Sequence, residues 1–178
     1  MDYNSIINKF YPHDNELRRL LTRHSRDVAD MALEIARRHP ELNIDLDFLE
    51  EGAMLHDIGI FMTDAKGIYC NGTDQYIRHG IDGAELLRKE GYPKHARVCE
   101  RHTGAGITLK QIEEQHLPLP AQDFLPETIE EKLICYADKF FSKSSPDRVK
   151  TIEQAERSVA KHGEDGLMRF REWERLFA

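Results

Sequence analysis

The chain has 178 residues, which is close to the usual size of one domain. A chain of this length can bury a hydrophobic core without the help of disulfides or structural metal ions. Hydrophobic residues make up 40% and charged residues 32%, a balance typical of globular chains and not of disordered ones. The net charge of −7 disfavours non-specific binding to nucleic acid or to an anionic membrane surface. No apolar run approaches the ~20 residues that a membrane span needs, so no membrane partner is expected.

The cysteines and the first ten residues indicate the compartment. Cys70, Cys99 and Cys135 form an odd set without a CxxC pair, which predicts reduced thiols and argues against a disulfide framework. The N-terminal residues lack the apolar segment and small-residue cleavage site of a signal peptide. We therefore expect a cytoplasmic protein.

Apolar residues recur with a helical period along nearly the whole chain. Gly59 is expected to adopt the left-handed conformation after its helix, and Thr108 with Gln111 and Thr128 with Glu131 form expected capping boxes. The predicted helices cover residues 15–38, 46–58, 75–90, 93–102, 108–116, 128–141, 151–162 and 165–177.

The absence of strand alternation and of internal repeats predicts one all-α domain over residues 1–178. Its helical bundle is expected to have a core at about 15–142, with the helices of 151–177 packed on it. The last helix, with Trp173 and Phe177 beside Arg171 and Arg175, is expected either to pack on this core or to form a homodimer face.

Two polar residues occupy positions where the helical pattern predicts apolar ones. His24 follows Leu20 and Leu21 on the buried stripe of the first long helix, and Asp138 lies between Ile134 and the end of the helix at 128–141. Each has an ordinary explanation, a hydrogen-bonded core histidine or a carboxylate paired with Arg or Lys. A buried carboxylate without such a partner needs a cation or a raised pKa.

The adjacent pair His56–Asp57 favours metal binding for this set. The pair closes the helix at 46–58, where side chains from a helix end can project into a shared centre. Imidazole and carboxylate ligands together suit Fe, Mn, Co, Ni or Zn, and suit Ca or Mg alone poorly.

The segments around His24, Leu55–Gly59 and Ala137–Lys139 resemble the H…HD…D signature of the HD superfamily, in its HDIG variety. The resemblance covers about residues 17–141, and the tract 100–107 looks like a poorly characterised prokaryotic subgroup. It implies an all-helical fold with a metal site in its interior. It also implies a metal-dependent phosphohydrolase whose metal-bound hydroxide attacks a small phosphorylated metabolite or nucleotide, with His56 and Asp57 as catalytic residues.

The same resemblance implies two metal ions. One ion would be held by His24, His56, Asp57 and Asp138, and a second by His79 and His102 with Asp57 as a bridge. From spacing alone, His79 and His102 are equally compatible with surface or helix-end histidines. The other histidines match no ligand position and are expected to face solvent: His13, His39, His95, His116 and His162.

Several residues are candidates for contacting a phosphate. Backbone N–H groups at Gly104 and Gly106 precede a helix, although an ordinary turn is the simpler interpretation. Lys66 lies in the loop after the HD pair. Lys139, Arg78 and Arg101 are each adjacent to an expected ligand, although most such charges are simply solvated.

Two other function classes remain open. Two-iron oxygenases of the superfamily share the order His, His–Asp, His, His, Asp, although the upstream Tyr/Glu pair of phosphonate-cleaving members has only Tyr11 and Glu16 as counterparts. A non-catalytic module that binds a phosphorylated ligand is the other alternative. HD-GYP phosphodiesterases usually carry Lys where this chain has Ile60, and the large triphosphate hydrolases are longer, so neither fits.

Overall fold

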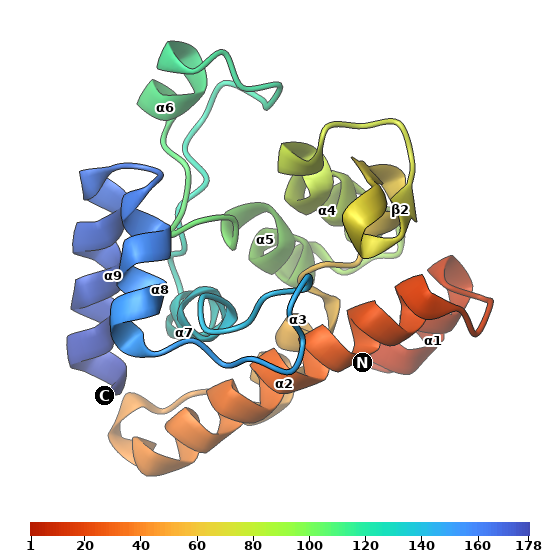
Figure 1. Cartoon of the computed structure of the whole chain (residues 1–178). Coiled ribbons are helices and arrows are strands. Elements are labelled where there is room, and N and C mark those ends of the chain that lie inside the picture. Colours follow the sequence, from red (N-terminus) through yellow and green to blue (C-terminus); the bar gives the residue numbers. More distant parts are fainter.

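The computed structural model describes residues 1–178 and shows an all-α bundle, which confirms the predicted fold class (Figure 1). A two-stranded antiparallel ribbon of β1 (Asp64–Ala65) and β2 (Cys70–Asn71) and four 3₁₀ turns are the other regular elements. The α-helices are α1 (Tyr3–Phe10), α2 (Glu16–Arg38), α3 (Leu46–Leu55), α4 (His79–Lys89), α5 (Pro93–Arg101), α6 (Leu109–Glu114), α7 (Ile129–Asp138), α8 (Ile152–Ala160) and α9 (Glu164–Phe177).

The long helix α2 forms the base on which α3 and α7 pack, while α5 lies against both of them and α4 lies against α5 (Figure 1). The apolar stripe of α2 explains this arrangement, because Leu21 and Val28 are fully buried against the other helices. Leu55 of α3 and Leu133 of α7 are equally buried in the same core. None of the helices has the length and apolar character needed to cross a bilayer.

The last two helices pack on the bundle through α7. The ring of Tyr136 stacks on Phe170 with centroids 5.1 Å apart and lies 5.5 Å from Phe177. Trp173 is also buried, so the apolar side of α9 is used for packing on the core. Of the two expectations for this helix, the structure shows core packing.

Most predicted helices lie within a few residues of their predicted limits, and Thr108 with Gln111 forms the expected capping box. The helix α1 was not predicted. The helix α3 ends at Leu55, before the predicted Ile58, and the prediction for Gly59 is wrong because its φ is −84°. Thr128 caps α7 as expected, but the Glu131 carboxylate accepts from the backbone N–H of Glu127 and not from the capping residue.

Candidate metal centre

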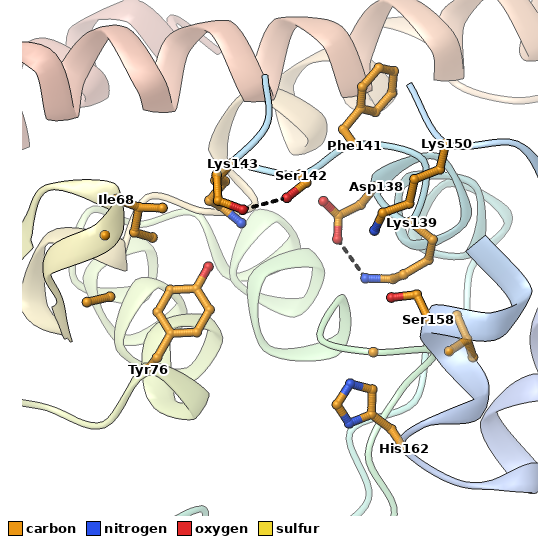
Figure 2. Close-up of a pocket in the computed structure, with 15 residues that line it drawn as sticks. Ile68, Tyr76, Asp138, Lys139, Phe141, Ser142, Lys143, Lys150, Ser158 and His162 are labelled. Atoms are coloured by element: carbon orange, nitrogen blue, oxygen red, sulfur yellow. Dashed lines mark hydrogen bonds and ion pairs between the residues drawn. The ribbon is translucent and has the colours of Figure 1, made fainter. Parts of the chain in front are cut away.

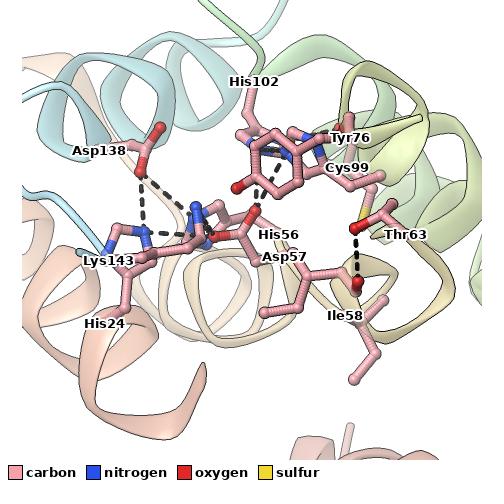
Figure 3. A network of polar contacts seen from close by, with 12 residues as sticks. His24, His56, Asp57, Ile58, Thr63, Tyr76, Cys99, His102, Asp138 and Lys143 are labelled. Atoms are coloured by element: carbon pink, nitrogen blue, oxygen red, sulfur yellow. Dashed lines mark hydrogen bonds and ion pairs between the residues drawn. The ribbon is translucent and has the colours of Figure 1, made fainter. Parts of the chain in front are cut away.

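Six polar side chains from different parts of the chain converge in the interior between α2, α3, α4, α5 and α7 (Figure 3). All of them are buried, with relative exposures of 9% or less. Their donor atoms fall into two groups, and within each group the atoms lie within 4.8 Å of one another. The members are His24, His56, Asp57 and Asp138 in one group and Asp57, His79 and His102 in the other.

The first group joins α2, the end of α3 and α7. The Nε2 atom of His24 lies 3.0 Å from Oδ1 of Asp138 and 3.3 Å from Oδ2 of Asp57. The Nε2 atom of His56 lies 3.2 Å from the same oxygen of Asp57 and 3.5 Å from that of Asp138. Two imidazoles and two carboxylates thus point their donor atoms at one small volume.

The second group uses the other oxygen of Asp57. Oδ1 lies 3.3 Å from Nε2 of His79 and 3.2 Å from Nε2 of His102, and these two nitrogens are 3.0 Å apart. Since Asp57 presents Oδ2 to one group and Oδ1 to the other, its carboxylate is placed to bridge two ions. The structure therefore brings all six sequence-predicted ligands together in the arrangement that the resemblance implies.

Backbone carbonyls orient three of the histidines. In His56, His79 and His102, Nδ1 lies 2.6–2.7 Å from the carbonyl oxygen of the residue three positions earlier. A carbonyl accepts only, so Nδ1 carries a proton in each ring, and the neutral form of the ring presents the Nε2 lone pair to the centre. This is the tautomer that a metal ligand requires.

The unsatisfied atoms of the centre fit a bound cation. Nε2 of His56 and Oδ1 of Asp57 are buried without a hydrogen-bond partner, and the other carboxylate oxygen of Asp57 has an ion pair as its contact with a cation of the protein. Burial of such atoms is costly unless something else satisfies them. Burial lowers the pKa of His102 to about 4, so that this imidazole is neutral and available as a ligand at pH 7. The donor set thus fits a divalent transition-metal ion.

Two glycines allow the ligands to approach one another. A Cβ at Gly59 would lie 2.4 Å from the carbonyl oxygen of His79 and 2.4 Å from the backbone nitrogen of Gly83. A Cβ at Gly80 would lie 2.5 Å from the carbonyl oxygen of Cys99. The missing side chains let α4 lie against both α5 and the turn at residues 56–59, which we call the HD turn, and this packing places His79 beside Asp57 and His102.

A cavity of about 480 Å³ opens beside the centre and is rich in lysine (Figure 2). The ammonium of Lys143 lies 2.7 Å from Oδ2 of Asp57, and that of Lys139 lies 2.6 Å from Oδ2 of Asp138. Burial opposes ionisation of both carboxyls, but these lysines hold the pKa of each well below its usual range. Lys150 also lines the cavity, so one wall carries three ammonium groups, two of which are paired with carboxylates of the centre.

Sequence reasoning did not identify Lys143, Lys150 or Tyr76. Tyr76 is stacked on His79 with ring centroids 4.5 Å apart, and its hydroxyl points toward Lys143 (Figure 3). Burial raises the pKa of Tyr76 to about 12, so the hydroxyl keeps its proton. The two lysines lie in the loop between α7 and α8, where no helical period identifies an inward-facing residue.

The structure places some of the expected phosphate-binding residues at the cavity and others elsewhere. Lys139 and Gly104 line the cavity, whereas Gly106 lines a neighbouring hollow that shares Gly104 with it. Lys66 is exposed and is not part of the lining, although the adjacent Gly67 is. The expectation for Lys66 is therefore not met.

The two arginines next to the expected ligands are engaged in structural contacts. The guanidinium of Arg78 donates to the carbonyl oxygen of Pro118 at 2.7 Å and pairs with Asp82 at 3.0 Å. Arg101 pairs with Glu131 at 3.0 Å. Neither arginine lines the cavity, so the expectation that they reach a phosphate is also corrected.

The remaining candidates have other surroundings. His95 is buried and lies 2.7 Å from Glu51, so the expectation that it faces solvent is wrong. His162 is exposed as expected but lines the cavity. The Tyr11 hydroxyl donates to the carbonyl oxygen of Ile58, and Glu16 is exposed, so neither supports the oxygenase alternative.

The chain belongs to the HD domain family, because the family model described as HD domain matches residues 21–142. It is 38% identical over 136 residues to the tRNA (cytidine(56)-2'-O)-methyltransferase of Picrophilus torridus, covering 76% of this chain and 34% of that protein. The enzyme of the same name from Thermoplasma volcanium is 36% identical over 123 residues, or 68% of this chain and 32% of its own length. No solved structure matches.

A protein of Methanocaldococcus jannaschii named only as uncharacterised is 38% identical over 118 residues, which cover 65% of this chain and 62% of that protein. The chain thus spans about a third of the named methyltransferases and less than two thirds of this relative. The expectation of a phosphohydrolase is overturned, since the relatives that carry a functional name are tRNA methyltransferases.

Proposed function

We propose that the chain is a metal-dependent nucleotide-binding domain that serves tRNA modification. It binds two divalent transition-metal ions and, with them and the cavity lysines, the phosphate of a nucleotide. The observation that carries the proposal is the pair of donor groups that share Asp57 and adjoin the cavity. His24, His56 and Asp138 complete one ion site.

The composition of the donor groups selects the ions. Each group mixes imidazole nitrogens with carboxylate oxygens, a combination that suits Fe, Mn, Co, Ni or Zn. Bound ions supply positive charge that attracts phosphoryl oxygens. The second group offers only three ligand atoms from the protein, one each from Asp57, His79 and His102. A site with three protein ligands leaves coordination positions for an exogenous ligand.

The cavity supplies the rest of the binding site. Its volume of about 480 Å³ falls within the range of sites for ligands of nucleotide size. Lys139, Lys143 and Lys150 present three ammonium groups to it, and lysine binds phosphate as a compact point charge. The hydroxyls of Ser142 and Ser158 add hydrogen-bonding groups on the same wall.

The relatives supply the tRNA context. Two of them are named for methylation of a cytidine in tRNA, and the region similar to this chain makes up about a third of each. A nucleotide phosphate is a ligand that a domain working on tRNA would meet. We therefore choose cytidine monophosphate as the probe.

The test is calorimetric titration of cytidine monophosphate into the metal-loaded protein. Binding is expected, and Lys143→Met is expected to weaken it at least about tenfold, since hydrogen bonds to charged groups contribute about 1.5–3 kcal/mol. The matched control is Lys66→Met, which removes an exposed lysine outside the cavity and should bind as the unaltered protein does. Metal content of both variants should stay unchanged.

Equal binding after the ions are removed with a chelator would contradict the proposal, because the ions would then play no part. Unchanged binding by Lys143→Met would show that the nucleotide does not occupy the lysine-lined cavity.

A further inference from the structure

Another hollow adjoins the cavity along α8. It has a volume of about 560 Å³ and shares Ser142, Lys150 and Ser158 with the cavity beside the metal centre. We call it the basic groove. Its lining contains no hydrophobic residue and no acidic residue, and consists of Ser142, Ser145, Arg148, Lys150, Gln154, Arg157, Ser158 and Lys161.

The arrangement of α8 explains why these groups share one surface. Gln154, Ser158 and Lys161 are spaced by four and three residues, and Arg157 lies four residues before Lys161, so all of them lie on one side of the helix. The loop after α7 brings Arg148 to the same surface. The positive wall of the metal cavity and the basic groove therefore form one continuous strip.

The cations of the basic groove have no direct salt-bridge partner in the protein. Arg148, Lys150, Arg157 and Lys161 make no salt bridge. The acidic neighbours are paired elsewhere: Asp147 lies 2.8 Å from Arg23, and Glu156 lies 2.6 Å from Arg171. Glu153, four residues before Arg157 on α8, is exposed and forms no salt bridge with it, although the two opposite charges attract each other.

The surroundings of Lys150 show the same concentration of positive charge. Burial lowers its pKa, and the like charges of Lys139, Lys161 and Lys143 lower it further, against the opposite effect of Asp138. In a chain whose net charge is −7, a strip of this kind is a local exception. Its charge favours an extended polyanion.

We propose that the basic groove binds the phosphate backbone of an RNA strand, one nucleotide of which occupies the lysine-lined cavity beside the metal centre. The proposal rests on the proposed function for that nucleotide and adds the neighbouring ones. Arg148, Arg157 and Lys161 lie beyond the cavity, so a lone mononucleotide in the cavity leaves them without a partner. Serine hydroxyls and the Gln154 amide supply the neutral contacts that phosphate oxygens also receive in such interfaces.

The test uses a fluorescein-labelled single-stranded RNA of about ten nucleotides, with binding to the metal-loaded protein followed by fluorescence anisotropy at several salt concentrations. The triple variant Arg148→Gln/Arg157→Gln/Lys161→Gln is expected to bind this RNA at least about tenfold more weakly. Its plot of log affinity against log salt should be less steep by about two, because each phosphate that the protein neutralises on a single strand adds roughly 0.7 to the slope.

The matched control is Arg37→Gln/Lys89→Gln/Lys94→Gln, which changes the net charge equally at exposed residues away from the basic groove. This control should bind RNA as the unaltered protein does. Equal losses of affinity in both triple variants would overturn the proposal, as would unchanged binding by the groove variant or displacement of the RNA by an equal concentration of poly-glutamate.

Cytidine monophosphate binding separates this proposal from the one on which it rests. The groove variant should bind the mononucleotide with unchanged affinity, because its three residues lie outside the cavity. If the unaltered protein binds no mononucleotide, the proposed function fails. If it binds the mononucleotide but the groove variant keeps full RNA affinity, only the groove assignment fails.

Discussion

The variant Asp57→Asn is expected to lose both metal ions while keeping its helical content. The carboxylate presents one oxygen to each donor group, and the neutral amide that replaces it has a single oxygen and no charge. Metal analysis by mass spectrometry after gel filtration should fall from two ions per chain to nearly none. Far-UV circular dichroism should stay unchanged, because Asp57 follows the end of α3 and accepts no hydrogen bond that holds a helix.

The companion variant His79→Ala makes this experiment selective. His79 belongs only to the second donor group, so its loss should remove one ion and leave the other. Retention of both ions by Asp57→Asn would show that the carboxylate does not bridge. Loss of both ions in His79→Ala would show that the two groups do not bind independently.

The variant Gly59→Ala is expected to lower the free energy of unfolding by about 1–3 kcal/mol, the usual cost of forcing extra atoms into a packed interior. The added Cβ would meet two backbone atoms at 2.4 Å, and backbone cannot rotate away as a side chain can. Because one of those atoms is the carbonyl oxygen of His79, α4 must move away from the HD turn. We therefore also expect weaker binding of the second ion, measured by metal titration beside urea unfolding.

Gly67→Ala is the control for this prediction. Gly67 lies in the loop after the HD turn, and a Cβ there would have no atom within 4 Å. Its stability should stay within about 0.5 kcal/mol of the unaltered protein, as for ordinary surface changes. If Gly59→Ala were as stable as Gly67→Ala and kept full metal affinity, the close approach of α4 would not be what positions His79.

The bundle could be predicted from the sequence because its helices have strong local signals. The apolar stripe of α2 and the capping box at Thr108 lie in segments that specify their own structure. Gly59 shows where local reasoning failed, since a glycine after a helix usually serves a left-handed turn. Here the glycine is required by the backbone of α4, a segment about twenty residues later that no local pattern reveals.

The convergence of the candidate ligands could be predicted for a related reason. His24 and Asp138 are polar residues on apolar helix faces, and burial of such groups demands a partner. Lys143 and Lys150 carry no comparable signal, because lysines in a loop are usually solvated and only the folded chain shows them at the metal centre. The reverse holds for Arg78 and Arg101. They are adjacent to candidate ligands in the sequence, but their guanidinium groups pair with Asp82 and Glu131 instead of lining the cavity.

The reaction could not be predicted from the ligand set. The same six ligands were compatible with hydrolysis, oxidation or binding, and a fold does not fix which of these a domain performs. The link to tRNA in the proposed function comes instead from the names of two relatives. The net charge of −7 averages over the whole surface, so it does not reveal a local feature such as the basic groove.

The two-ion centre bridged by Asp57 is tested most directly by anomalous X-ray scattering from crystals of the protein grown with manganese. We predict two anomalous peaks about 3.5–4 Å apart, the usual separation of paired ions, on either side of the Asp57 carboxylate. One peak should lie among His24, His56 and Asp138 and the other between His79 and His102. Crystals with no peak at these residues, or with a single peak that Asp57 does not contact, would contradict a two-ion centre bridged by Asp57.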